Sequence, residues 1–168
     1  MILRERNLEL TLPPGTKAWK FDDDTHGLSH CMKAVDFIVE LADRFLFIEI
    51  KDPEHSSATL RTQQKFIQDF QSGRLDEELK YKYRDSFLYQ WACGSLKDKP
   101  IYYFVIVVLS SLTEADLLVR TEALRRQLPQ QGPSSGIWRR RIVEDCAVFN
   151  LQAWNSRLPQ YQIRRVHS

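Results

Sequence analysis

The sequence predicts an α/β protein in which helices flank a mixed central sheet that contains an antiparallel hairpin. Residues 35–51 predict the hairpin, because two runs of β-forming residues enclose a short polar turn. Residues 56–91 show the apolar spacing of two successive helices. Residues 101–109 are apolar without alternation, which is typical of a strand buried on both faces. Such a strand needs a covering layer on each side of the sheet.

The segment before the hairpin predicts a strand, a loop and a short helix. Leucine alternates with polar residues over residues 8–12, which indicates a half-buried strand. Proline and glycine end this strand at residues 13–15, and residues 18–21 are expected to return as its hairpin partner. Residues 22–27 read as a polar loop, and a short helix is expected from there to Lys33.

The register of the hairpin decides which side chains share a face. With a two-residue turn at 43–44, Asp36 lies opposite Lys51 and Ile38 lies opposite Glu49. The three polar side chains then project from one face. A three-residue turn would shift the register by one residue and separate Asp36 from the other two, unless a bulge restored it. In the favoured register the other face is entirely apolar, with Val35, Phe37, Val39, Leu41, Leu46, Ile48 and Ile50.

Two helices are expected between the hairpin and the buried strand. Pro53 breaks the second hairpin strand, and Ser56 or Ser57 can cap the first helix. A Ser-Gly pair at residues 72–73 interrupts the helical pattern, and Gly94 ends the second helix.

The last third of the chain predicts further alternation of helix and strand. Residues 113–128 open with an acidic first turn and continue as a helix, and residues 129–135 form a flexible connection. A late strand is expected at residues 147–151, followed by a helical turn at 152–157. Residues 161–166 are expected to form an edge strand.

Composition indicates one globular domain spanning residues 1–168, with 43% hydrophobic and 27% charged residues. No apolar run approaches the roughly 20 residues that cross a membrane, so no membrane association is expected. Charged residues follow Met1 closely, which argues against a signal peptide. The three cysteines are scattered and odd in number, which favours free thiols in a reducing compartment. We therefore expect a cytoplasmic protein.

The polar face of the hairpin has the composition of a divalent-cation site. Asp36 and Glu49 supply carboxylate oxygens, which are the ligands that Mg²⁺ or Mn²⁺ prefers. Lys51 beside such a cation could orient or deprotonate an attacking water and offset charge on a phosphoryl group. The alternative is a structural ion pair on a half-exposed sheet face.

Asp36 followed by Glu49-Ile50-Lys51 resembles the signature of the PD-(D/E)xK nuclease superfamily, with Val35 in place of the proline for which the motif is named. The resemblance implies a restriction-endonuclease-like sandwich and a Mg²⁺-dependent or Mn²⁺-dependent nuclease that hydrolyses phosphodiester bonds, most often in DNA. It implies that Asp36, Glu49 and the backbone carbonyl of Ile50 bind the metal and that Lys51 acts on the water. The alternative is a catalytically inactive relative that binds nucleic acid or serves as a partner subunit.

The resemblance also directs attention to acidic residues near the N-terminus. Many members of the superfamily carry a glutamate on an N-terminal helix near the metal. Glu5 and Glu9 are the candidates here, but their segment reads partly as strand, so neither can be chosen. One of the aspartates at residues 22–24 could supply an outer-sphere carboxylate.

The distribution of charge suggests a surface for nucleic acid. Residues 120–168 contain nine arginines, no lysine and three acidic residues, whereas the net charge of the whole chain is only +2. Arginine offers a planar fork that suits phosphate. We expect Arg139, Arg140 and Arg141, together with Lys82 and Gln90 on the second helix, to contact nucleic acid. No separate recognition segment is evident, so specificity could come from a homodimer or a partner protein.

Overall fold

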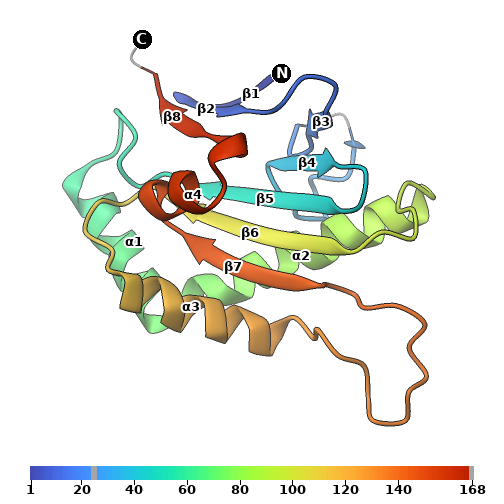
Figure 1. Cartoon of the computed structure of the whole chain (residues 1–168). Coiled ribbons are helices and arrows are strands. Elements are labelled where there is room, and N and C mark those ends of the chain that lie inside the picture. Colours follow the sequence, from blue (N-terminus) through green and yellow to red (C-terminus); the bar gives the residue numbers. More distant parts are fainter. Residues whose placement is uncertain (24–25, 167–168) are drawn as a thin grey trace.

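The computed structural model describes residues 1–23 and 26–166 and shows a mixed α/β fold with two sheets and four α-helices in that part of the chain (Figure 1). Strands β3, β4 and β5 of the larger sheet are antiparallel, and β5, β6 and β7 are parallel. The predicted mixed sheet with an antiparallel hairpin is confirmed. Its strands, in spatial order, are β3 (Lys17–Lys20), β4 (Phe37–Glu40), β5 (Phe45–Lys51), β6 (Ile101–Val107) and β7 (Asp145–Phe149).

A second, three-stranded sheet has the order β1 (Ile2–Glu5), β2 (Leu8–Thr11) and β8 (Ile163–Arg165). The expected pairing of residues 18–21 with residues 8–12 is therefore wrong: β3 pairs with β4, and β2 pairs with β1 and β8. A tight turn joins β1 to β2, with Arg6 in the left-handed region at φ 52°. β1 forms the backbone hydrogen bonds along one edge of β2, and the predicted edge strand β8 pairs with the other edge.

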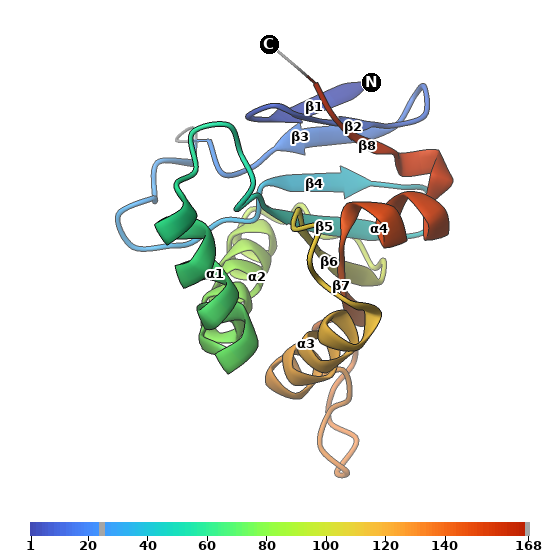
Figure 2. The same ribbon diagram turned by 90° about the vertical axis from the view of Figure 1, so that its left-hand side faces the viewer.

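The helices are α1 (Leu60–Ser72), α2 (Arg74–Ala92), α3 (Glu114–Gln127) and α4 (Leu151–Arg157). Helices α1, α2 and α3 cover one face of the larger sheet, and the small sheet and α4 cover the other, as Figure 2 shows. Side chains of the first three helices, such as Phe70, Tyr83 and Leu124, share a core with one face. Leu10 from the small sheet and Trp154 share a core with the other face.

No helix in the described part of the chain is both long enough and apolar enough to cross a membrane.

The helix starts follow local capping chemistry. Thr59, not Ser56 or Ser57, caps α1. Its hydroxyl accepts a hydrogen bond from the backbone N–H of Thr62, and the Thr62 hydroxyl accepts one from the backbone N–H of Thr59. Thr113 and Asp116 form the same reciprocal arrangement at the start of α3. The helix expected before Lys33 is replaced by a turn at residues 29–31 and irregular chain after it. Asp24 and Thr25 of the predicted polar loop lie outside the described residues.

The segment that leads into β4 is held by α2. The backbone N–H of Lys33 donates to the Asp85 carboxylate at 2.9 Å, and that of Val35 donates to the Ser86 hydroxyl at 3.0 Å. Val35 consequently packs in the core on the helix side, not on the apolar face predicted for it. These bonds fix where Asp36 enters the sheet.

The β4–β5 register differs by two residues from the predicted one. Leu41 N–H donates to Arg44 O at 2.8 Å, so the turn lies at residues 42–43. With the turn in this place, the Arg44 guanidinium lies 5.2 Å from the centroid of the Tyr102 ring on β6. Since a shift of two preserves the alternation of strand side chains, the residues from 36 onwards keep their predicted faces.

We expect Gly73→Ala to destabilise the protein by roughly 2–4 kcal/mol. Gly73 has φ +79°, and a Cβ there would lie 2.5 Å from Arg120 Nη1, which binds the buried Asp76 at 2.9 Å. Gly94 also has a left-handed φ, +65°, but open space around it. Gly94→Ala should therefore cost only about 1 kcal/mol. Urea unfolding measures the free energy of unfolding of both variants. Equal losses would show that displacing Arg120 from Asp76 costs no stability.

Candidate functional site

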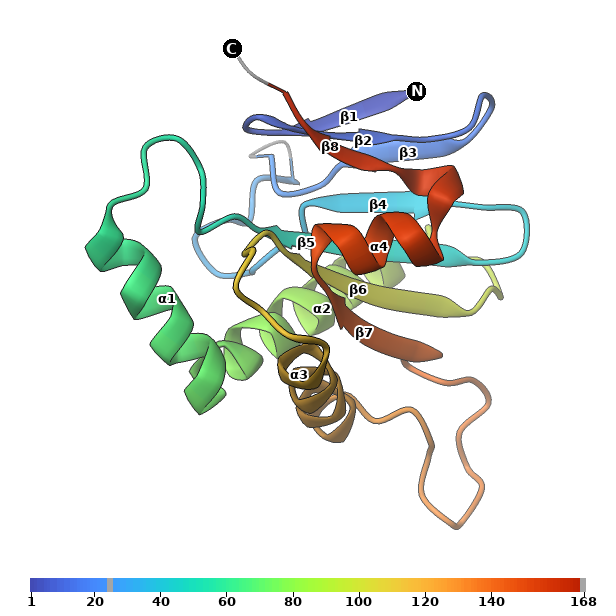
Figure 3. The ribbon, with the colours of Figure 1, turned by 60° about the vertical axis from the view of Figure 1, so that its left-hand side comes forward.

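A cleft of about 380 Å³ opens at the carboxyl end of β5. Figure 3 shows this end of the strand between the small sheet and the start of α1. Residues from five separate segments meet there, so only the folded chain assembles it. Its charged and polar lining is mainly acidic near the sheet. The lining residues are Glu5, Arg6, Asp22, Asp36, Glu49, Ile50, Lys51, Asp52, Pro53, His55, Ala58, Thr62, Phe66 and Lys82.

Asp36 and Glu49 are buried next to each other at the floor of the cleft. Asp36 is 4% exposed and Glu49 is 1% exposed. In the observed register, Asp36 directly precedes β4 beside Glu49 on β5. One Asp36 oxygen accepts a hydrogen bond from the backbone N–H of Ile50, which fixes the carboxylate on the helix side of the sheet. The structure thus brings together the predicted carboxylate pair.

Glu49 is the least satisfied of the buried polar groups. The Nζ atoms of Lys82 and Lys51 lie 2.8 and 3.1 Å from its Oε1. Both ammonium groups therefore take up Oε1, whereas Oε2 has no hydrogen-bond partner among the described residues. A buried carboxylate held only by ion pairs retains free lone pairs for a cation.

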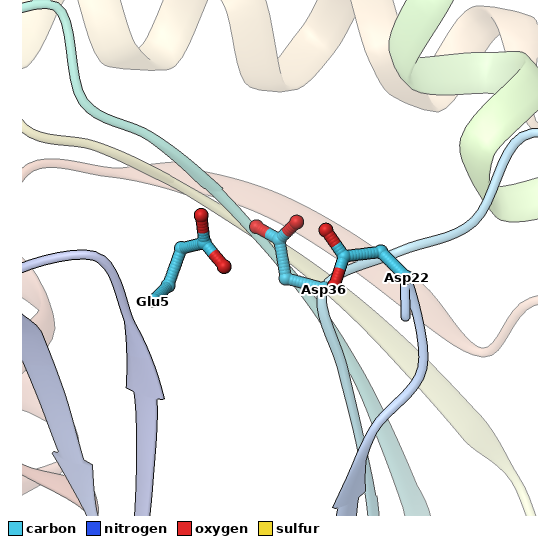
Figure 4. A group of neighbouring side chains, drawn as sticks. All are labelled: Glu5, Asp22 and Asp36. Carbon is cyan, nitrogen blue, oxygen red and sulfur yellow. The ribbon is translucent and has the colours of Figure 1, made fainter. Parts of the chain in front are cut away.

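Glu5 and Asp22 extend the acidic cluster beyond the predicted pair. One oxygen from each of Glu5, Asp22 and Asp36 lies within 4.8 Å of the others, and Figure 4 shows the three carboxylates turned toward a common point. Lys20 stands beside them, with its Nζ atom 2.6 Å from Glu5 and 3.5 Å from Asp22. Asp36 therefore belongs both to this group and to the pair with Glu49.

Burial and mutual repulsion shift the protonation of the pair. Burial, followed by the charge of Glu49, raises the pKa of Asp36 to about 8, although Lys82 and the Ile50 N–H act in the opposite direction. Burial also raises the pKa of Glu49, and the charges of Lys51 and Lys82 oppose that shift only in part. Without a cation, the carboxylate pair holds a proton more tightly than exposed carboxylates do.

Lys51 lies beside Glu49 on the predicted face of the sheet, although not opposite Asp36 as predicted. Its Nζ atom is 2.7 Å from Glu78 on α2 and 3.1 Å from Glu49. Burial disfavours its charged form, but Glu49 and Glu78 outweigh burial and raise the pKa of Lys51. The amine therefore keeps its proton at neutral pH and can donate hydrogen bonds but cannot accept a proton.

The loop after Lys51 is braced by distant parts of the chain. Arg165 on β8 makes two hydrogen bonds to the buried carboxylate of Asp52, at 2.9 and 2.8 Å. The backbone N–H and the hydroxyl of Ser110 both donate to Glu54. These contacts hold the wall of the cleft that carries His55.

Of the predicted nucleic-acid contacts, Lys82 alone is among the residues that line the cleft. Lys82 on α2 lines it, whereas Gln90, two turns further along α2, is buried outside it. Residues 139–141 lie on the loop before β7, where Arg140 donates to Lys99 O and Arg141 pairs with Glu144 at 2.7 Å. That loop is at the starting end of β5 and β6 (Figure 1), about 20 Å of strand from the cleft. A role for these arginines in nucleic-acid binding stays a prediction.

The donor set fits a hard divalent cation. The available ligands are carboxylate oxygens, and Oε2 of Glu49 accepts no hydrogen bond in the described chain. Asp36 and Glu49 could hold one ion, with the Ile50 carbonyl as a further ligand, and Glu5 and Asp22 lie on the other side of Asp36. Mg²⁺ and Mn²⁺ suit such ligands better than zinc does.

The sequence offers Glu5 and Asp22 as candidates for further carboxylates near the metal but does not select them over their neighbours. The observed β1–β2 turn directs Glu5 toward the cleft, whereas Glu9 on β2 pairs with Arg4 and Arg164 and does not line it. A sequence signal does exist: Glu5 directly precedes the tight turn, and Asp22 follows the strand that pairs with β4. Recognising it requires knowledge of which strand pairs with which.

We expect Asp36→Asn to stabilise the cation-free protein by about 1–3 kcal/mol at pH 8. Since the pKa of Asp36 is raised from 3.8 to about 8, folding binds a proton, and stability contributed by this group is lost as pH rises from about 4 to 8. The amide oxygen of an asparagine can still accept the bond from Ile50. Urea unfolding in EDTA at pH 5 and pH 8 measures the effect, with the exposed Asp98→Asn as control. An Asp36→Asn variant less stable than the parent at pH 8 would contradict the electrostatic account.

Comparison with known proteins leaves the site to be interpreted from its own geometry. No family model, curated protein or solved structure matches this chain. The assignment of roles therefore depends on the residues that the fold brings into the cleft.

Proposed function

We propose that this protein is a divalent-cation-dependent nuclease of the PD-(D/E)xK superfamily, with a restriction-endonuclease-like arrangement of its mixed sheet. The observation that carries the proposal is the buried Glu49 carboxylate, whose Oε2 accepts no hydrogen bond in the described chain, beside Asp36 and Lys51 on the floor of an open cleft. A buried salt bridge evolved only for stability would leave fewer lone pairs unsatisfied. The expected substrate is the phosphodiester bond of DNA.

The three motif residues would divide the work. Asp36 and Glu49, with the Ile50 carbonyl, would hold Mg²⁺ or Mn²⁺, which supplies charge for the phosphate and lowers the pKa of a bound water. Lys51, protonated in the cation-free state, would donate hydrogen bonds to the attacking water and to a phosphate oxygen. The proton from the water would leave to solvent or to another base, since the Lys51 amine already carries its own.

The position of Glu78 supports a positioning role for this residue. Glu78 lies on α2, and its carboxylate is 2.7 Å from the Nζ atom of Lys51. The same Nζ atom is 3.1 Å from Glu49. The lysine is therefore kept near the carboxylate pair from a second side. A freely rotating lysine would lose more side-chain entropy on meeting the transition state.

A module that binds nucleic acid without cutting it is the alternative. The observation that favours it is the arginine loop at residues 139–141, which provides positive charge far from the cleft. Its surface could serve nucleic acid or a second protein.

We expect the purified protein to cleave DNA with Mg²⁺ or Mn²⁺ and to stop in EDTA. Lys51→Met should lower turnover at least about 100-fold with Mg²⁺ affinity retained, because it removes a donor and not a cation ligand. Glu49→Gln should weaken Mg²⁺ binding at least about tenfold. Cleavage of a labelled DNA and calorimetric titration with Mg²⁺ measure the two effects.

Lys97→Met is the control for these variants, because the exposed Lys97 pairs with Glu40 at the far end of the hairpin and its variant should cleave like the parent. Equal cleavage by the parent and by the Lys51 and Glu49 variants would assign the activity to a contaminant and would refute the proposal.

Replacing Arg139, Arg140 and Arg141 with Gln should weaken binding to unrelated DNA sequences and flatten the dependence of affinity on salt. The expected loss is about tenfold at low salt. Mg²⁺ affinity measured at about 0.15 M salt should be unchanged, because screening is strong beyond about 10 Å there. Fluorescence anisotropy over a salt series measures both quantities. An unchanged salt slope would reassign these arginines to solubility or to a protein interface.

A further inference from the structure

Lys82 occupies the place in the cleft where a cation would be expected. Its Nζ atom is 2.8 Å from Glu49 Oε1 and 3.8 Å from Asp36 Oδ1. The side chain is 16% exposed and lines the cleft, so its ammonium group lies between the carboxylate pair and the open space. One positive charge from α2 thus faces both proposed cation ligands.

Lys82 differs from Lys51 in its partners. Lys51 has a carboxylate of its own, Glu78, at 2.7 Å, which it can keep whatever happens at Glu49. The ion pairs of Lys82 in the described part of the chain are with Asp36 and Glu49 alone. A change in the charge of that pair therefore acts on Lys82 more than on Lys51.

The backbone beneath Lys82 is fixed, but its side chain is long. The neighbouring Tyr83 is fully buried and donates a hydrogen bond to Ile142 O at 2.6 Å. Tyr103 on β6 donates to Leu79 O on the same helix at 3.0 Å. Four methylene groups let the ammonium move within the cleft while α2 stays in place.

We propose that Lys82 is an internal counter-ion of Asp36 and Glu49 that moves to a substrate phosphate when a divalent cation takes over the two carboxylates. The proposal rests on the proposed function. A divalent charge at the pair repels the ammonium from both carboxylates with which it pairs, and Glu78, the other acidic group that interacts with its charge, is already held by Lys51. On the open side of the cleft, the phosphate of a bound strand is then an anion with which Lys82 can pair.

Cation and phosphate binding are coupled in this arrangement. In the cation-free protein Lys82 is engaged by Glu49, so a phosphate must compete with a buried carboxylate for it. With a cation bound, the ammonium is available, and each ligand raises the affinity for the other by the same factor. Lys82 therefore competes with the cation and assists the phosphate.

The Lys82→Met variant tests both halves of this statement. We expect it to bind Mg²⁺ at least about tenfold more tightly than the parent, because a competing charge is gone. We expect its affinity for a phosphorothioate oligonucleotide, which resists cleavage, to fall about tenfold in Mg²⁺ and to change little in EDTA. Calorimetry at about pH 9, where protons compete least for the carboxylates, measures the first quantity, and fluorescence anisotropy measures the second.

Lys80→Met is the matched control. Lys80 is on the same helix, pairs with Glu77 at 3.7 Å and does not line the cleft, so both affinities should equal those of the parent. Lys82→Arg keeps the charge and should retain the weaker Mg²⁺ affinity of the parent. Circular dichroism establishes that each variant is folded, and the Arg variant provides the comparison if the Met variant is not.

The outcomes separate this inference from the proposed function. A parent protein that binds no Mg²⁺ refutes the proposed function and the inference together. A parent that binds Mg²⁺ and a folded Lys82→Met variant of equal Mg²⁺ affinity refute the inference alone. If Lys82→Met loses oligonucleotide affinity equally in Mg²⁺ and in EDTA, Lys82 is an uncoupled phosphate contact, and the inference is also wrong. If Lys82→Met is unfolded and Lys82→Arg binds Mg²⁺ more tightly than the parent, the competition does not depend on charge and the inference fails.

Discussion

Two carboxylates, Asp36 and Glu49, are buried side by side at the end of the β4–β5 hairpin, and much of the surrounding structure compensates for that placement. Buried like charges repel each other and lose hydration, which is why the pKa of Asp36 rises to about 8. Lys51 and Lys82 supply nearby positive charge, and the Ile50 N–H supplies a hydrogen bond. The compensation is incomplete, because Oε2 of Glu49 accepts no hydrogen bond in the described chain.

The chain topology explains how these compensating groups arrive. Parallel strands β5 and β6 require a crossover, and here the crossover consists of α1 and α2. Its second helix crosses the helix-side face of the sheet and carries Glu78 and Lys82 to the carboxylate pair. The small sheet contributes Glu5 from the opposite side of the cleft. One cleft therefore collects charges from both layers that cover the central sheet.

The arginines of the last third have structural partners that composition conceals. Arg125 makes two hydrogen bonds to Asp145, Arg164 pairs with the buried Glu9, and Arg165 holds Asp52 beside the cleft. Several of these positive charges thus stabilise the fold. Removing one partner of such a pair would leave a poorly solvated charge. The paired arginines therefore do not count as a surface for nucleic acid.

Periodicity and residue chemistry determined the mixed sheet, the buried strand β6 and the common face of Asp36, Glu49 and Lys51. These features depend on alternation along single strands, so even a hairpin register wrong by two residues left the face correct. Only the tertiary structure decided that β2 pairs with β1 and β8, that Glu5 and Asp22 approach Asp36, and that Lys82 faces Glu49. Contacts between segments far apart in sequence depend on how layers pack and which strands pair, and local patterns carry little information about either.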